Sequence, residues 1–596
     1  AELIGALDAE SWAAAASIRE TIGGKSISRD ELHETLLSSL GEARVLRIVG
    51  QHGTGKSAML KRLASEEPAG APILLLRDLR VTGGGWAAHA AKFGRPMPIA
   101  SLLRQFGLGG ARTLFIDGAD KMDAAAQVTI NDLLKAIVDT PDLTDWRVVM
   151  TMREENAQRV DAWLEPDIAS LPSKTIRVEG FDDDEANEAA AALPLLRPLL
   201  VDTRSYDAVL RRPFFLEALS RLPVRSGAEV RSEVDLVDLW WEHGGADRAA
   251  LLLGPGVALS IRGIEAVALH ELLQAGVLRH VELGVSVAFS HDIFEEWILA
   301  KVLRGRRSEI AQALHDGGQH PQLARPLQLL AADLLERSET GNEWAALLEA
   351  VDDDELQTTW RRVVLTAPVR SVRSADMLDR IEAILMRDDA RLLARLIMSV
   401  RTTETVRDLR FMDQKLFPDL TNDQREQFAS ETAGPEIVSW MRLIAWLIPR
   451  LGVMPASLDK ELFTFLSTWA SAIPGEFGRY AGLQETAAWA VEKLGDTDST
   501  DERRRPALRG TPDYKDEARG LLLKCVSGAP DIVRNYLASI SDHRVGRVRK
   551  QILELSVVLA SVLPAEVTAF LKRAYLLNLD RPRERRRSGT IERSEA

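Results

Sequence analysis

The 596-residue sequence has a single cysteine, Cys525, and no uninterrupted apolar stretch of the length needed to cross a bilayer. One cysteine excludes a disulfide framework within the chain and a cysteine-rich zinc site. The apolar neighbours in GLLLKCVSG favour a buried structural thiol over a reactive one. The N-terminal stretch AELIGALDAESW lacks the basic region of a signal peptide. We therefore expect a cytoplasmic protein without membrane contact.

An excess of positive charge is also missing. The 75 lysines and arginines stand against 88 aspartates and glutamates, which gives a net charge of -13. A dedicated nucleic-acid binder carries a basic footprint, so direct nucleic-acid binding is not expected. Apolar residues make up 46% of the chain and charged residues 27%, an ordinary globular balance. The length is sufficient for several domains.

The order of the apolar runs predicts an α/β domain over residues 42–180. The short runs RVLRIV, PILLL, RTLFID, WRVVMT and KTIRVEG alternate with helical patterns, as in a parallel sheet that is covered on both faces. Residues 1–41 are polar and helical in pattern, and we interpret them as a helical linker. Residues 181–225 open with acids suited to a helix N-terminus, in DDDEANEAAAAL, and are expected to form a helical lid.

The rest of the chain is predicted to be largely helical. In residues 226–305, the helical patterns DLVDLWWEH and IEAVALHELLQAGVL precede the alternating VELGVSVAFS, which indicates a winged-helix domain. Residues 306–580 contain amphipathic helices with short polar breaks, similar to an α-solenoid but without a crisp repeat consensus. The tail 581–596, RPRERRRSGTIERSEA, is almost devoid of apolar residues and is expected to be disordered.

The stretch VGQHGTGKSA places three glycines, a lysine and a serine directly after an apolar run. It fits the pattern G-x-x-x-x-G-K-[ST], in which glycines let backbone N–H groups turn toward phosphate oxygens. Lys56 would bring a mobile charge to the β- and γ-phosphates, and the Ser57 hydroxyl would be a magnesium ligand. The helix that follows adds its positive end. The residues expected to bind the nucleotide here are Gly50, Gly53, Thr54, Gly55, Lys56, Ser57 and Ala58.

Polar residues also follow two later strands. Asp117 ends RTLFID at the carboxyl edge of the sheet, where α/β sheets bind ligands, and is expected to hold magnesium through water. Asp120 would orient or deprotonate the attacking water; the alternative is a solvated acid. Arg153 follows WRVVMT and would neutralise the γ-phosphate, unless it is a surface arginine. Because GADKMD lacks the Asn or Thr that a guanine-reading motif places before its lysine, ATP and ADP are the expected ligands.

Taken in order, GQHGTGKS, LFIDGAD and VVMTMR resemble the motifs of the STAND NTPases, signalling ATPases that include the NACHT and NB-ARC proteins. The resemblance covers residues 25–305 and implies a P-loop NTPase fold of the ASCE type. LRRPFFLEAL resembles the helical-lid segment of the family, which implies that Pro213 contacts adenine. FSHDIFEEW resembles the winged-helix His-Asp motif, which implies that His291 reaches the β-phosphate of ADP.

The resemblance implies a switch rather than a metabolic enzyme. ADP would hold the sheet, lid and winged-helix unit together, and ATP would favour an open form that assembles into a homo-oligomer. The region 306–580 would bind a trigger, expected to be a protein; in bacterial relatives the trigger is often a phage component, which points to antiviral defence. Residues 1–41 are too few for an effector domain, so the effector is expected in a removed segment or another protein. Lys121 stands where NACHT sequences often have a glutamate, so slow ATP hydrolysis is expected.

Two other functions remain open at this point. A P-loop ATPase of another class, such as a DNA-associated loader or remodeller, would show turnover stimulated by nucleic acid; the acidic net charge counts against it. A helical scaffold with a degenerate site would bind ATP without turnover. The intact Lys56, Ser57 and Asp117 count against degeneracy.

Overall fold

The chain divides into two compact units in a computed structural model. The first unit comprises residues 1–333 and 350–360, and the second comprises residues 334–349 and 361–596. The residues that the structure describes are 2–77, 80–94, 97–110, 112–169, 171–194, 196–197, 200, 210–221, 230, 232–243, 259–260, 266–282, 285–316, 318, 323–406, 424, 428, 432–473, 477–478, 481–495, 514–540 and 542–588.

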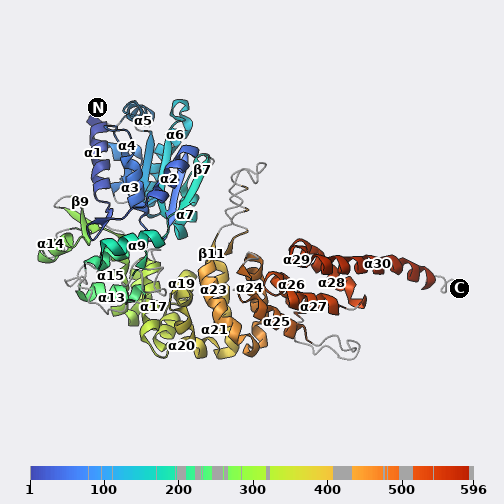
Figure 1. Ribbon diagram of the computed structural model, residues 1–596. Helices are drawn as coiled ribbons and strands as arrows, with labels where there is room; N and C mark the ends of the chain where they lie inside the picture. Colours follow the sequence, from blue (N-terminus) through green and yellow to red (C-terminus); the bar gives the residue numbers. More distant parts are fainter. Residues whose placement is uncertain are drawn as a thin grey trace. The chain divides into compact units, whose positions relative to one another are not determined.

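A five-stranded parallel sheet organises the first unit (Figure 1). All five strands predicted from the apolar runs are confirmed, and their spatial order is β4-β5-β6-β3-β7. Strand β6 therefore lies between β3 and β5, and the sheet fits the predicted α/β P-loop NTPase fold. The strands are β3 (Val45–Gly50), β4 (Leu74–Arg77), β5 (Thr113–Asp117), β6 (Arg147–Arg153) and β7 (Ser173–Arg177).

The strand register brings four polar or loop-forming positions to one edge of the sheet. Gly50 at the end of β3 lies opposite Arg153 at the end of β6. Arg77 at the end of β4 lies opposite Asp117 at the end of β5. Parallel strands all end on the same side, so these residues gather at the carboxyl edge where α/β sheets bind ligands.

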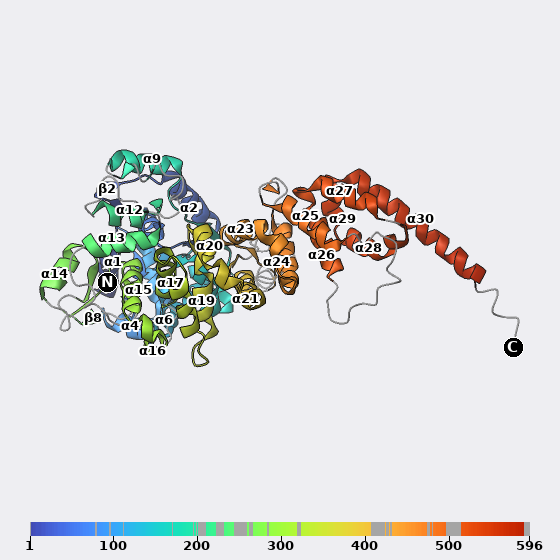
Figure 2. The same cartoon turned by 90° about the horizontal axis from the view of Figure 1, so that it is seen from below.

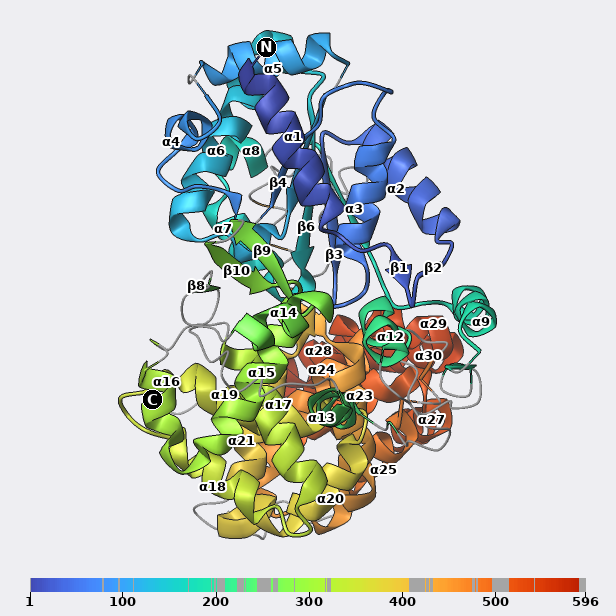
Figure 3. The same cartoon turned by 90° about the vertical axis from the view of Figure 1, so that its left-hand side faces the viewer.

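Helices cover both faces of the sheet because consecutive strand residues point to opposite sides. In β4, Leu74 and Leu76 pack with one core cluster, whereas Leu75 packs with the other. Figure 3 shows α4, α6 and α8 on one side and α2 and α3 on the other. The covering helices are α2 (Asp30–Glu42), α3 (Lys56–Ser65), α4 (Trp86–Ala91), α5 (Ile99–Leu108), α6 (Ala124–Asp139), α7 (Ala157–Trp163) and α8 (Pro166–Ala169).

Helix α1 (Glu2–Ala16) covers the edge strand β4. The carboxylate of Asp8 accepts a hydrogen bond from the Ile73 N–H at 2.8 Å, and the Ser11 hydroxyl accepts one from the Leu75 N–H at 3.0 Å. An edge strand presents unpaired backbone groups, and here side chains satisfy two of them. The segment that the polar pattern led us to interpret as a linker therefore packs against the sheet. After it come the short strands β1 (Thr21–Ile22) and β2 (Lys25–Ser26), which pair antiparallel.

The remainder of the first unit combines helices with a small antiparallel sheet. The alternating segment VELGVSVAFS contributes to the paired strands β9 and β10, and the strand order is β8-β10-β9. The elements are α9 (Asp183–Ala192), α12 (Pro213–Ser220), α13 (Glu233–His243), β8 (Leu259–Ser260), α14 (Ala266–Gln274), β9 (Leu278–Glu282), β10 (Ser286–Phe289), α15 (Asp292–Gly305) and α16 (Ile310–Asp316).

Helices make up nearly all of the described second unit. They follow one another in chain order along it (Figures 1 and 2). Helix α17 (Ala324–Arg337) begins in the first unit and its last residues belong to the second. The others are α18 (Asn342–Ala350), α19 (Thr358–Arg370), α20 (Ser374–Leu385), α21 (Arg387–Thr403), α23 (Ile437–Leu447), α24 (Asp459–Ala472), α25 (Leu483–Leu494), α26 (Lys515–Lys524), α27 (Pro530–Ser539), α28 (Asp542–Glu554), α29 (Ser556–Val562) and α30 (Pro564–Ser588), with the paired strands β11 (Thr405–Val406) and β12 (Gly434–Pro435).

Three expectations from the sequence concern Cys525, the C-terminal tail and membrane-spanning helices. Cys525 is fully buried, as predicted, and burial raises the pKa of its thiol to about 12. Helix α30 runs through residues 581–588, where the composition predicts disorder; arginine and glutamate are good helix formers even without apolar neighbours. Residues 589–596 lie outside the described residues. Among the helices that the structure describes, none is long and apolar enough to span a bilayer.

Candidate functional site

The glycine loop joins β3 to α3 at the carboxyl edge of the sheet. Gly53 has φ +75° and Gly55 has φ +94°, left-handed backbone that glycine adopts without strain. The Lys56 ammonium group folds back over the loop and donates hydrogen bonds to the carbonyl oxygens of Gly50, at 3.0 Å, and Gln51, at 2.6 Å. Phosphate oxygens are charged acceptors and bind an ammonium more strongly than neutral carbonyls do. The loop can therefore exchange these internal contacts for a phosphate.

Asp117 joins the loop to two neighbouring strands. One carboxylate oxygen accepts hydrogen bonds from the hydroxyls of Ser57, at 2.8 Å, and Thr151, at 2.7 Å. The other oxygen lies 3.2 Å from Nε of Arg77. The carboxylate is only 3% exposed, and the guanidinium of Arg77 compensates its charge.

The predicted magnesium ligands fit that ion. Ser57 and Asp117 offer a hydroxyl and a carboxylate side by side, and magnesium in nucleotide sites takes one or two such protein oxygens together with phosphates and water. Within the described residues there is no group of three or more His, Cys, Asp or Glu arranged to hold a metal by themselves. A magnesium ion at this site would therefore depend on phosphate oxygens as well.

Asp120 and Arg153 form an ion pair. Nε of Arg153 lies 3.0 Å from Oδ2 of Asp120, and the side-chain amide of Asn156 donates to the same oxygen at 2.9 Å. Nη1 of Arg153 donates to Oε1 of Glu296 on α15 at 2.9 Å. The guanidinium thus bridges the sheet and the helix that follows the small antiparallel sheet. Neither alternative from the sequence, a solvated acid or a surface arginine, is correct: both side chains are largely buried, because they neutralise each other.

Pro213 and His291 approach the loop from elements outside the sheet. Pro213 is the first residue of α12, and the next residue, Phe214, donates its backbone N–H to the Gly53 carbonyl at 3.2 Å. The ring of Phe214 lies on the imidazole of His291, with ring centres 4.1 Å apart. His291 immediately precedes α15 as its N-cap. The loop is therefore packed against both α12 and α15.

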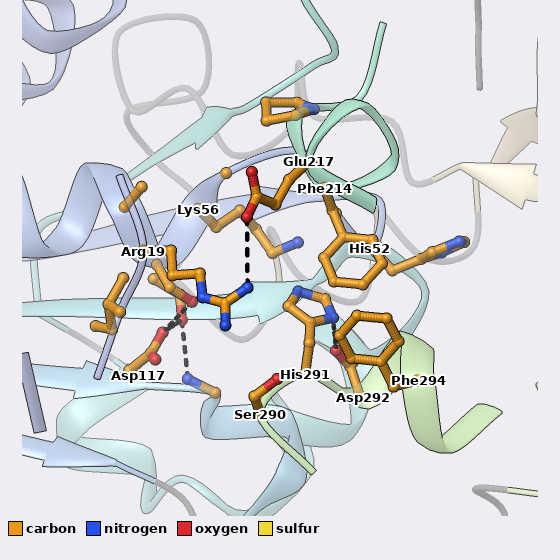
Figure 4. A pocket seen from close by; sticks show the side chains of 18 of the residues that line it. Arg19, His52, Lys56, Asp117, Phe214, Glu217, Ser290, His291, Asp292 and Phe294 are labelled. Carbon is orange, nitrogen blue, oxygen red and sulfur yellow. Dashed lines mark hydrogen bonds and ion pairs between the residues drawn. The ribbon is translucent and has the colours of Figure 1, made fainter. Parts of the chain in front are cut away.

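His291 is oriented by charged neighbours. Its Nδ1 lies 2.8 Å from Oδ1 of Asp292, and the second oxygen of Asp292 lies 3.1 Å from Nζ of Lys121. Burial lowers the pKa of His291, so the ring is neutral. Burial alone would raise the pKa of Asp292, but Lys121 and His291 outweigh it and hold that pKa well below its usual range. In Figure 4 the other ring nitrogen of His291 faces into the cavity.

These residues line one cavity of ≈ 280 Å³ in the first unit (Figure 4). Ten of the residues predicted to form the nucleotide site contribute to its wall, although they come from segments far apart in the chain. They are Gly53, Gly55, Lys56, Ser57, Ala58, Asp117, Asp120, Arg153, Pro213 and His291.

Gly50 and Thr54, which were also predicted, belong to the loop but not to the cavity wall. The Gly50 carbonyl accepts from Lys56, as described above. The Thr54 carbonyl accepts a hydrogen bond from Nη1 of Arg29 at 2.9 Å, and Nε of Arg29 pairs with Glu185 of α9 at 2.8 Å. The carbonyl groups of these two residues therefore help to hold the loop in place.

The sequence analysis did not identify several charged residues of the wall. Arg19 lies 3.5 Å from Glu217 of α12, and its Nη2 donates to the Gly276 carbonyl at 3.3 Å. Arg77 could have been found, because it ends an apolar run in the same way as Asp117 does. Glu296 carries no signal in the sequence, since its role depends on which helix faces Arg153.

Comparison with known proteins gives only distant similarity. No family model and no curated protein matches the chain. Among solved structures, it is similar to a signal transduction ATPase with numerous domains (STAND) protein with a tetratricopeptide repeat sensor from Pyrococcus horikoshii, at 13% identity and a TM-score of 0.31, over 96% of this chain and 85% of that one. It is also similar to a Walker-type ATPase of Pyrococcus abyssi, at 13% identity and a TM-score of 0.23, over 46% of this chain and 95% of that one. The P-loop NTPase fold is assigned from the strand order, the glycine loop and Asp117.

Proposed function

We propose that this chain is an ATP/ADP-dependent signalling switch of the STAND type. The observation that carries the proposal is that Lys56 of the glycine loop, Pro213 of α12 and His291 before α15 line one cavity. A ligand there would touch three separate elements at once. A switch requires a ligand that joins separable elements, because its binding free energy then depends on how those elements are arranged.

The phosphates would bind at the loop. Backbone N–H groups and the positive end of α3 favour an anion, and Lys56 would exchange its carbonyl partners for phosphate oxygens. Ser57 and Asp117 would hold magnesium, which when bound supplies positive charge to the phosphate oxygens. Asp120 and Arg153 would act on a third phosphate and its attacking water.

Cavity residues from outside the parallel sheet would contact the adenine base and the β-phosphate. We assign adenine to the wall that includes Pro213 and the β-phosphate to the inward-facing nitrogen of His291. Both assignments come from the resemblance to STAND NTPases, and their support is that the two residues line the same cavity as Lys56. We also assign a winged-helix role to the segment 226–305, supported by the hairpin β9-β10 and the helix α15 that follows it.

In this proposal the two nucleotides favour different arrangements. ADP stabilises the closed form, and ATP favours an open form that assembles into a homo-oligomer. A ligand shifts such an equilibrium only by its differential affinity for the two states. The helical region 306–580 would act as a solenoid-like sensor for a trigger, in defence against phage, and the effector would be supplied by another segment or protein.

A specific observation also favours slow turnover. Asp120 is fully engaged by Arg153 and Asn156, and Lys121 pairs with Asp292 instead of providing a second acid. The Oδ2 oxygen of Asp120 would have to give up these hydrogen bonds before it could accept a proton from water. A nucleotide-binding protein with a slow ATP site is therefore the second candidate.

The substitution Lys56→Ala tests the proposal. Each charge-assisted hydrogen bond contributes about 1.5–3 kcal/mol, so the loss of the ammonium should weaken ADP and ATP binding at least about 100-fold in isothermal titration calorimetry. Lys135→Ala is the matched control, because Lys135 is an exposed lysine on α6 that pairs with Glu165. Unchanged ADP affinity in Lys56→Ala would remove the loop from the account.

A further inference from the structure

One carboxylate in the cavity wall lacks a complete set of partners. Glu296 lies on α15 and is 5% exposed. Its Oε1 accepts a hydrogen bond from Nη1 of Arg153 at 2.9 Å. Its Oε2 is buried and, within the part of the chain that the structure describes, has no hydrogen-bond partner. A buried carboxylate oxygen without a partner is costly, and such groups mark places where a ligand, a proton or a change of conformation matters.

Two carboxylates already contact Arg153 and compete with any further anion for its guanidinium. Its guanidinium carries one positive charge and contacts two carboxylates, Asp120 and Glu296. Asp120 belongs to the same sheet domain and is also held by Asn156. Glu296 comes from α15 and has Arg153 as its only hydrogen-bond partner among the described residues. Glu296 is therefore the partner that a competing anion would displace.

We propose that Glu296 occupies on Arg153 the position that a third phosphate requires, and so makes the closed form selective for a nucleoside diphosphate over a triphosphate. This inference rests on the proposed function, in which Arg153 faces the third phosphate. Glu296 excludes the triphosphate in two ways: its carboxylate repels the added negative charge, and it already holds the guanidinium.

The same contact links nucleotide state to the position of α15. A triphosphate gains Arg153 only if Glu296 leaves it. When Glu296 leaves, the ion pair between β6 and α15 is lost. Binding of the third phosphate to Arg153 then favours separation of α15 from the sheet. ATP and ADP therefore differ in their relative affinities for the closed and open forms, as a switch requires.

The surroundings of Glu296 make its charge sensitive to pH. The pKa of Glu296 is raised to about 8, first by burial and then by the charge of Asp292, while Arg153 opposes the shift. Arg325 also lowers this pKa, and Glu233 raises it. The carboxylate form, which the proposal requires, therefore predominates above pH 8, and selectivity for the diphosphate should increase as the pH rises through that value.

The test is the variant Glu296→Gln in the full chain, with ADP and ATP as probes at pH 8.5 and equal magnesium. We expect the ratio of ATP affinity to ADP affinity to rise at least about 10-fold, mainly through tighter ATP binding. The effect should disappear when Arg153→Gln is also present, because Glu296 then has no guanidinium to occupy. Asp238→Asn is the matched control. It removes the ion pair between Asp238 of α13 and Lys301 of α15, the helix that carries Glu296, but Asp238 lies outside the cavity wall. The ratio of ATP affinity to ADP affinity in this variant should therefore stay that of the wild type.

Each outcome bears on a different part of the argument. An unchanged ratio in a Glu296→Gln protein that binds ADP overturns the inference and leaves the proposed function standing. Failure of the wild type to bind either nucleotide overturns the proposed function, and this inference falls with it. If Glu296→Gln does not fold, the wild type alone decides: its ratio of ATP to ADP affinity should fall between pH 7.5 and 9, and a constant ratio contradicts the inference.

Discussion

Single charged residues of the cavity are mostly compensated in pairs. Asp117 faces Arg77, and Asp292 faces Lys121. Such pairs remain charged when buried because each partner replaces part of the hydration that the other loses. Glu296 differs, since one of its oxygens is buried without a described hydrogen-bond partner. Glu296 is therefore the group that we expect to titrate near pH 8.

Glu296 should make the stability of the protein depend on pH. Its pKa is raised to about 8 in the native state, whereas an unfolded chain keeps an ordinary value near 4.5. Between these values the native state holds one more proton, so the free energy of unfolding falls as the pH rises, by at most about 1.4 kcal/mol per pH unit. The contribution is fully present below the unfolded pKa and is lost as the pH rises through 8.

Urea unfolding at a series of pH values checks this dependence. We expect the wild type to lose stability relative to Glu296→Gln between pH 5 and 8, and the two curves to run parallel above pH 8.5. A difference that stays constant over the whole range would show that Glu296 is already ionised at low pH.

At the scale of elements, the site depends on contacts between segments that are distant in the chain. Gly53 illustrates this, because a Cβ there would lie 3.0 Å from the Cβ of Phe214 and 3.1 Å from Ile293. Only a glycine lets the loop approach α12 and α15 so closely. Helix α1 has a similar role at the other side of the sheet, where it satisfies the backbone of the edge strand β4.

The variant Ser11→Ala tests the role of α1. Ser11 is 2% exposed and accepts a hydrogen bond from the Leu75 N–H, so its removal leaves a buried donor unsatisfied. We expect a loss of about 1–3 kcal/mol in the free energy of unfolding, measured by chemical denaturation. Ser65→Ala is the control, because both hydroxyls donate to the carbonyl four residues earlier but Ser65 is exposed. Equal effects of the two substitutions would mean that α1 does not stabilise the strand.

The sequence could predict the strands and the loop because their signals are local. Strands β3, β4, β5 and β6 are largely buried and largely apolar in sequence, whereas the edge strand β7 is only partly buried; all five runs became strands. The glycine loop and Asp117 have a pattern that follows from phosphate chemistry. The packing of α1 on β4 could not be predicted, because the alanine-rich sequence of α1 does not indicate which element it packs against. Glu296 could not be predicted because its contact with Arg153 joins residues 143 positions apart.

Within the first unit, a chain of side-chain contacts connects the glycine loop to α17. Glu233 of α13 lies 3.5 Å from Nε2 of His52 in the loop, accepts from Nε1 of Trp297 at 3.1 Å and pairs with Arg325 of α17. Burial lowers the pKa of His52 to about 4, so its ring is neutral. Arg325 lies on α17, the helix whose last residues belong to the second unit.

The central claim is that one nucleotide joins the loop, α12 and α15 and that its third phosphate releases them. The most direct test is the solution mass of the purified full chain by light scattering, measured on one preparation after loading with ADP and after loading with ATP and magnesium. We expect a monomer with ADP and a defined homo-oligomer with ATP. We also expect the nucleotide that is recovered from the untreated protein to be ADP. A mass that is the same with ADP, with ATP and without nucleotide would contradict the account.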